Sequence, residues 1–143
     1  MKTILAKKIF EIGARARNPT LYQQYEYLKS TEWLSREQLQ NIQLENADKF
    51  LKFSGEQSPY YKKLFKNHGF NPKKFSAISD LKVLPELQKS TLISDNLTIH
   101  TQGLTEKCKL AETSGTSGAA LAFYRNERWD SINRAVLMRS YDW

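Results

Sequence analysis

Cysteine is nearly absent from this chain, since Cys108 is its only one. A single cysteine cannot form an internal disulfide, which argues against a secreted scaffold held by disulfides. Neither Cys108 nor the two histidines, His68 and His100, lies in a CxxC or HxxxH spacing that would hold zinc. We therefore expect no metal site.

Long apolar runs are missing as well. Near the N-terminus, only Ile4, Leu5 and Ala6 stand together as a short apolar group before Lys7 and Lys8, which is too short for the apolar part of a signal peptide. No run approaches the length of about 18 residues that a membrane-spanning helix needs. The sequence predicts a cytoplasmic protein without stable membrane insertion.

The length and composition nevertheless allow a folded core. The chain has 143 residues, of which 40% are apolar, and its mean hydropathy is −0.62. That value is polar for a globular domain, yet an aromatic content of 12% is too high for a disordered tail. We expect at most one ordinary domain, which is folded but does not fully bury its own apolar faces.

The net charge of +7 is regional. Residues 1–17 and 58–75 carry ten basic groups against Glu11 alone, whereas residues 76–143 are electrically balanced. In 58–75 the lysines alternate with aromatic residues, which is typical of a surface that binds single-stranded nucleic acid. The alternative is an ordinary amphipathic helix. In that helix the side chains at 61, 64–65 and 68 pack inward and the lysines face solvent.

Start and stop signals predict a series of helices in the N-terminal two thirds. Ser35 and Gln38 have the spacing of a capping box before an apolar stripe that ends near Gly55. Ser58 precedes a proline and is predicted to begin the next helix, which Gly69 closes. The other expected helices cover 3–15 and 21–33, and one short helix starts at 89–91.

After these helices, 70–85 reads as a loop with helical turns, which Leu81, Val83, Leu84 and Leu87 anchor to a larger body. The pattern changes near Lys107. Residues 107–113 and 119–125 are suited to strands, and Asn126 is the predicted cap of a final helix that runs to the end. The residue pattern thus favours a mixed α/β chain.

Between the two predicted strands lies the most informative segment, Thr113, Ser114, Gly115, Thr116, Ser117 and Gly118. Glycine lets the backbone approach an anion closely, while hydroxyl and amide groups donate hydrogen bonds to phosphate oxygens. The segment therefore suits a polyphosphate-binding loop, and a plain hairpin turn of the same composition is the alternative.

Two better-known motifs do not fit this segment. The Walker A motif needs four residues between its glycines and then a lysine, whereas here two residues intervene and Ala119 follows. A hydrolase nucleophile at Ser117 needs a histidine later in the chain, and both histidines come earlier. Neither a P-loop NTPase nor a hydrolase triad is expected.

The segment resembles the first ATP-binding signature of the adenylate-forming enzymes. The closest resemblance is to the phenylacetate-coenzyme A ligase type, which includes coenzyme F390 synthetases and the capsular polysaccharide biosynthesis proteins similar to them. The leader shares this resemblance at 28–35 (LKSTEWLS), 58–65 (SPYYKKLF), 69–72 (GFNP) and 81–91 (LKVLPELQKST). The resemblance extends over roughly residues 20–143.

The resemblance implies an α/β fold with a helical leader at 1–57 and the start of the large domain at 58–143. That domain would hold the first strands and the phosphate-binding loop and be incomplete in this chain. It implies ATP with Mg²⁺ and coenzyme A as cofactors, a small-molecule carboxylate as substrate, and no nucleic acid. All six residues 113–118 would contact ATP, and the resemblance assigns no catalytic residue. It is also compatible with a role in the synthesis of surface polysaccharides.

Family members often continue this loop with lysine and proline, where the chain has Ala119 and Ala120. The missing lysine removes a charge that would face the phosphates, and Arg125 or Arg128 is a candidate to replace it. The family's later elements have no counterpart before Trp143. Two alternatives therefore stay open: a non-catalytic basic module that binds nucleic acid or an anionic membrane surface, and an inactive truncated remnant.

Overall fold

The computed structural model describes residues 2–103, 107–114 and 120–142. Most of these residues are helical, and the described strands form one two-stranded antiparallel sheet, so the chain belongs to the mixed α/β class. The described residues divide into two compact units. Unit 1 lies within 1–34, 106–109 and 125–143, and unit 2 lies within 35–105 and 110–124.

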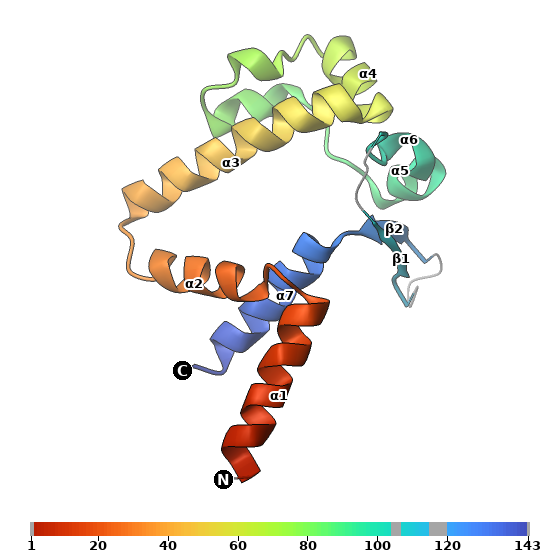
Figure 1. Ribbon diagram of the computed structural model, residues 1–143. Helices are drawn as coiled ribbons and strands as arrows, with labels where there is room; N and C mark the ends of the chain where they lie inside the picture. The colour runs from red at the N-terminus through yellow and green to blue at the C-terminus, as the bar shows by residue number, and fades with distance from the viewer. Residues whose placement is uncertain (1, 104–106, 115–119, 143) are drawn as a thin grey trace. The chain divides into compact units, whose positions relative to one another are not determined.

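Unit 1 is built from α1 (Lys2–Arg17), α2 (Leu21–Thr31) and α7 (Glu127–Ser140). Helices α2 and α7 pack side by side (Figure 1), with Leu21 of α2 and Ala135 of α7 buried. Near the carboxyl end of α7, Arg139 forms an ion pair with Glu32. This unit joins the two ends of the chain.

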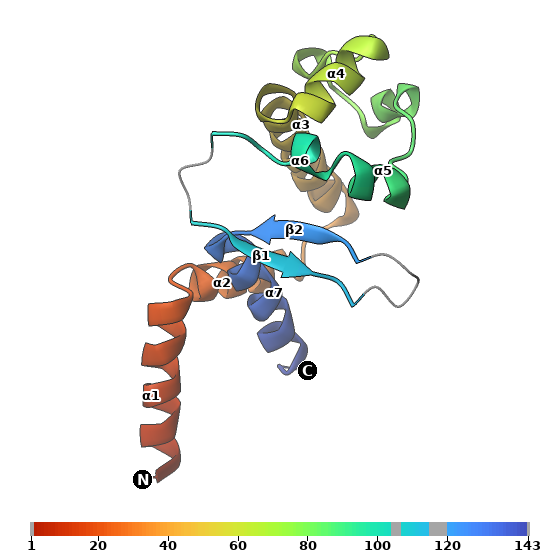
Figure 2. The same ribbon diagram turned by 90° about the vertical axis from the view of Figure 1, so that its right-hand side faces the viewer.

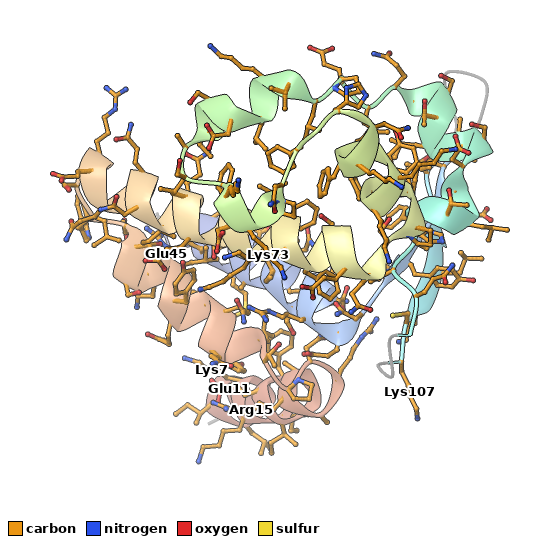
Figure 3. The ribbon with its side chains drawn as sticks, turned by 90° about the horizontal axis from the view of Figure 1, so that it is seen from above. Lys7, Glu11, Arg15, Glu45, Lys73 and Lys107 are labelled. Atoms are coloured by element: carbon orange, nitrogen blue, oxygen red, sulfur yellow. The ribbon has the colours of Figure 1, made fainter. Side chains whose placement is uncertain are left out.

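Helix α1 ends where the sequence changes from helix formers to Asn18 and Pro19, and it is longer than the predicted 3–15. Its described apolar side chains stay exposed, including Leu5, Ile9 and Ile12. Figure 3 shows Lys7, Glu11 and Arg15 on the same side of this helix, as a spacing of four residues dictates. The described helices include none that is both long and apolar enough to span a membrane.

Unit 2 begins with α3 (Arg36–Gln57), and the predicted capping box at its start is confirmed. The Gln38 N–H donates to the Ser35 hydroxyl at 3.2 Å, and the Ser35 N–H donates to the Gln38 side chain at 2.8 Å. These two bonds satisfy backbone groups that the first turn of a helix leaves without partners. Local sequence therefore fixes where α3 starts.

The predicted helix start at Ser58 is also confirmed, for α4 (Pro59–Asn67). The buried Ser58 hydroxyl accepts from the Tyr61 N–H and donates to the Ile99 carbonyl oxygen at 2.9 Å. Ile99 ends α6 (Asn96–Ile99), so one side chain both caps α4 and joins it to α6. At the other end Gly69 adopts a φ of 62°, a left-handed conformation that favours glycine and ends helices.

The core of unit 2 forms where α3 and α4 meet. Leu51, Phe65 and Phe70 are buried there, and the partly buried apolar residues around them are Tyr61, Phe75, Leu81 and Leu84. Gly55 permits this approach, because a Cβ at that position would lie 3.1 Å from the Phe65 ring. The aromatic rings of Phe65 and Phe70 meet nearly edge to face at 5.0 Å between centroids.

The rest of unit 2 consists of short elements. These are the 3₁₀ turns η1 (Pro72–Lys74) and η2 (Ile78–Val83), the helix α5 (Lys89–Ser94), and most of the strands β1 (Lys109–Glu112) and β2 (Ala122–Arg125). The strand residues Lys109 and Arg125 belong to unit 1. Figure 2 shows the two strands running in opposite directions. The Asn96 side chain donates to the Ala122 carbonyl oxygen at 2.6 Å, which joins α6 to β2.

Several predictions for this region were wrong in detail. The single short helix expected after Lys89 is divided at Asp95 into α5 and α6. Of the four expected anchors, Leu81 and Leu84 pack on the core, whereas Val83 and Leu87 are exposed. A 3₁₀ turn has three residues per turn, so Leu81 and Leu84 share a side that Val83 cannot join. His68 is exposed because it caps the end of α4.

Replacing Phe65 with alanine should destabilise unit 2 by about 3–5 kcal/mol, because the change leaves a cavity among Leu51, Phe70 and Gly55. Urea unfolding followed by circular dichroism measures this. The matched control is Phe50→Ala on the exposed side of α3, where 58% of the residue is accessible and the change should cost about 0.5 kcal/mol. Equal losses in the two variants would contradict the packing described here.

Candidate functional site

The candidate phosphate-binding segment connects the two strands of the hairpin. Its neck is closed by two hydrogen bonds: the Thr113 N–H donates to the Leu121 carbonyl oxygen at 3.0 Å, and the Leu121 N–H donates to the Thr113 hydroxyl at 2.9 Å. The Thr113 hydroxyl thus points to the neck, where it accepts the hydrogen bond from Leu121. It follows that Thr113 serves the hairpin geometry, whereas Ser114 is exposed.

The other four predicted contact residues, Gly115, Thr116, Ser117 and Gly118, lie outside the described residues. The contacts expected for them with ATP stay predictions. The structure does show the two strands on either side of this segment. Both strands were expected and both are present, and each is shorter than predicted. The segment is therefore held at both ends by one hydrogen-bonded ladder.

Arg125, one candidate to replace the missing lysine, lies at the end of β2. Its guanidinium carbon stands 5.5 Å from the centroid of the Trp129 ring in α7, within the range of a cation–π contact. Arg125 also lines a cavity at the amino end of α7. The Arg125 side chain therefore lies among residues of unit 1.

The lysine-rich segment 58–75 uses its aromatic residues for packing. Phe65 and Phe70 are buried, and Tyr61 and Phe75 pack against them, while Lys62, Lys63 and Lys66 of α4 are exposed. A nucleic-acid platform requires exposed aromatic rings on which bases stack. The interpretation as a packed face beside a solvated face is thus confirmed for Tyr61 and Phe65 of α4, and Phe70 and Phe75 join the same packing from beyond the helix.

The described residues include no cluster of histidine, cysteine and carboxylate side chains that would hold a metal ion. Cys108 is half-buried and forms no disulfide. His100 packs edge-on against Tyr124, with 5.0 Å between ring centroids. Its role within unit 2 is thus an aromatic contact between the end of α6 and β2.

A polar cluster fastens the α1–α2 junction to the first turn of α7. Glu127 accepts hydrogen bonds from the N–H and the hydroxyl of Thr20, each at 3.1 Å from Oε1, and from the fully buried Ser131 hydroxyl. Asp130 accepts from the buried Asn18 amide at 3.0 Å and from Arg134 at 2.9 Å. We call these residues the junction cluster.

Both carboxyl groups of the junction cluster favour their ionised form. Burial is the largest effect on Glu127 and raises its pKa, but the hydrogen bonds from Ser131 and Thr20 together lower it below the usual value. For Asp130 the hydrogen bond from Arg134 lowers the pKa most, followed by that from Asn18. Both groups are therefore negatively charged at neutral pH.

Sequence reasoning missed the junction cluster. Thr20 and Glu127 are 107 positions apart, and Asn18 and Asp130 are 112 apart. Within the sequence, Glu127 and Asp130 read only as acidic residues in the first turn of a helix, where they are common for local reasons. No local signal indicates that their partners come from the other end of the chain.

A scan of protein-family models and a search of curated proteins found no match to this chain.

Lowering the pH should weaken unit 1 through the junction cluster. A carboxyl group whose pKa is lower in the folded than in the unfolded state stabilises the fold above its unfolded pKa, near 4. That stability is lost as the pH falls through the folded pKa. Glu127→Gln removes one such group, so the midpoint of thermal unfolding should fall less steeply below about pH 4.5 than in the parent.

Circular dichroism melts between pH 6 and pH 3 measure this dependence. The control is Glu26→Gln, a neutralised carboxylate that is exposed on α2 in the same unit. It should retain the steep decline of the parent. A Glu127→Gln profile parallel to that of Glu26→Gln would contradict the assignment.

Proposed function

We propose that this protein is an ATP-dependent carboxylate-activating ligase of the adenylate-forming type, and that residues 113–118 contact the phosphates of ATP. The observation that carries the proposal is the position of this hydroxyl- and glycine-rich segment between β1 and β2, where Thr113 and Leu121 close its neck. A segment held at both ends loses less conformational freedom when it orders around a ligand.

The reaction defines what the segment has to do. A carboxylate oxygen of the substrate attacks the α-phosphorus of ATP, pyrophosphate leaves, and an acyl-adenylate remains for attack by a thiol such as that of coenzyme A. Hydroxyl groups and backbone N–H groups in 113–118 would hold the β- and γ-phosphates, which become the leaving group. Such groups contribute by fixing orientation and by stabilising negative charge.

The absence of a lysine after Gly118 bears on ATP affinity. With Ala119 and Ala120 in the following positions, the segment offers neutral donors only, and Mg²⁺ bound to the phosphates would have to neutralise more of their charge. The proposal therefore implies that ATP binding depends strongly on Mg²⁺. Arg125 gives no support as a replacement, because its contacts lie with Trp129.

The test is carboxylate-dependent exchange of pyrophosphate into ATP, using the protein expressed from its whole coding sequence. Gly115→Val adds a branched side chain where the backbone has to approach phosphate, and exchange should fall on the order of 100-fold. The matched control is Gly13→Val in α1, where an added Cβ meets nothing within 4 Å and exchange should stay unchanged.

Exchange that is equal in the Gly115→Val variant and the parent would remove the assignment of 113–118 to ATP. Absence of exchange in the parent with a broad panel of carboxylates would remove the ligase proposal itself.

A further inference from the structure

A small cavity at the amino end of α7 gathers basic side chains from segments that are distant in the sequence. Its volume is about 180 Å³, below the 300–1,000 Å³ or so that is typical of sites for drug-sized ligands. Arg17 reaches it from the end of α1, Lys107 and Lys109 from the entry to β1, and Arg125 from the end of β2. All four belong to unit 1.

Two carboxylates, Glu127 and Asp130, also line this cavity, but both already hold other partners. Glu127 accepts from Thr20 and Ser131, and Asp130 accepts from Asn18 and Arg134. Among the residues that the structure describes, none of the four basic side chains forms an ion pair within 4.0 Å. The described side chains that line the cavity therefore carry four positive charges against two negative ones.

Bringing like charges together in one cavity is unfavourable unless an anion neutralises them. The surplus here is two positive charges, which equals the charge of a phosphate dianion. The two arginines also supply planar groups of N–H donors, whose geometry matches two oxygens of one phosphate. Charge, size and donor type thus agree on one ligand class.

We propose that this cavity binds a small phosphate-bearing anion, either inorganic phosphate or the phosphate group of a phosphorylated small molecule. The site lies outside residues 113–118 and is independent of the function proposed above. Arg17, Lys107 and Lys109 are exposed, whereas Arg125 is half-buried and contacts the Trp129 ring.

The test is a titration of the ¹⁵N-labelled 143-residue chain with inorganic phosphate at low ionic strength. Saturable shifts of the Asn18 side-chain amide and of the Asn126 backbone amide, fitting one site, are expected. A parallel titration with glycerol phosphate distinguishes the two ligand sources. If glycerol phosphate binds more tightly than inorganic phosphate, the ligand is a phosphate ester. If it binds equally or more weakly, the ligand is the free phosphate ion. Either order supports the site.

Arg17→Gln and Lys107→Gln should each weaken binding about tenfold, the usual consequence of losing one hydrogen bond to a charged group. Lys7→Gln removes the same charge from α1 but lies outside the cavity, so it should change affinity by less than a factor of about two. Thermal melts of all three variants check that the fold is retained.

Three results would overturn the proposal. The first is a set of shifts that do not saturate or that chloride reproduces at equal ionic strength. The second is an equal loss in Lys7→Gln, which indicates general attraction by net charge. The third is a set of shifts centred on Thr113 and Leu121 that Gly115→Val abolishes, because the anion then binds the 113–118 segment and supports the proposed ligase function instead.

Discussion

The junction cluster is the constraint on which unit 1 depends. Asn18 and Thr20, at the turn between α1 and α2, donate to Asp130 and Glu127 in the first turn of α7. These bonds hold together two segments that the chain separates by more than a hundred residues, and they give both half-buried carboxylates hydrogen-bond partners. The packing of α2 on α7 and the presence of Arg17 and Arg125 in one cavity are consistent with this closure.

The same closure explains why basic side chains gather at the amino end of α7. A helix start attracts negative charge, and α7 supplies that charge itself through Glu127 and Asp130. Thr20, Ser131, Asn18 and Arg134 already engage these carboxylates. Their two negative charges offset only part of the four positive charges on the described side chains of the cavity. The fold thereby creates a local surplus of positive charge by bringing Arg17 to the same cavity as three basic residues of the balanced segment 76–143.

Local signals in the sequence were sufficient for the ends of several helices. The helix caps at Ser35, Ser58 and Asn126 form hydrogen bonds to groups within three residues. Both partners of each bond are therefore visible in a short stretch of sequence. The packing of Tyr61 and Phe65 was equally accessible, because helical spacing alone places them on one side. These predictions concern single helices and do not say how the helices pack against one another.

What the sequence could not provide was the pairing of distant polar residues and the division into two units that each combine separate segments. Asn18 carries no local sign that it is buried against Asp130, and Arg17 carries none that it lines one cavity with Lys107. The candidate phosphate-binding segment was predictable from the sequence only in part. Its composition was visible in 113–118, and the structure adds the closed neck at Thr113, while the assignment to ATP stays a proposal.

The central claim is that residues 113–118 receive the terminal phosphates of ATP. Photo-crosslinking with an ATP analogue that carries its reactive group on the γ-phosphate, followed by peptide mass spectrometry, tests it most directly on the protein expressed from its whole coding sequence. We predict that the label falls within 113–118 and that excess ATP with Mg²⁺ prevents it. Labelling of Arg17 or Lys107 instead, with 113–118 unmodified, would contradict the claim.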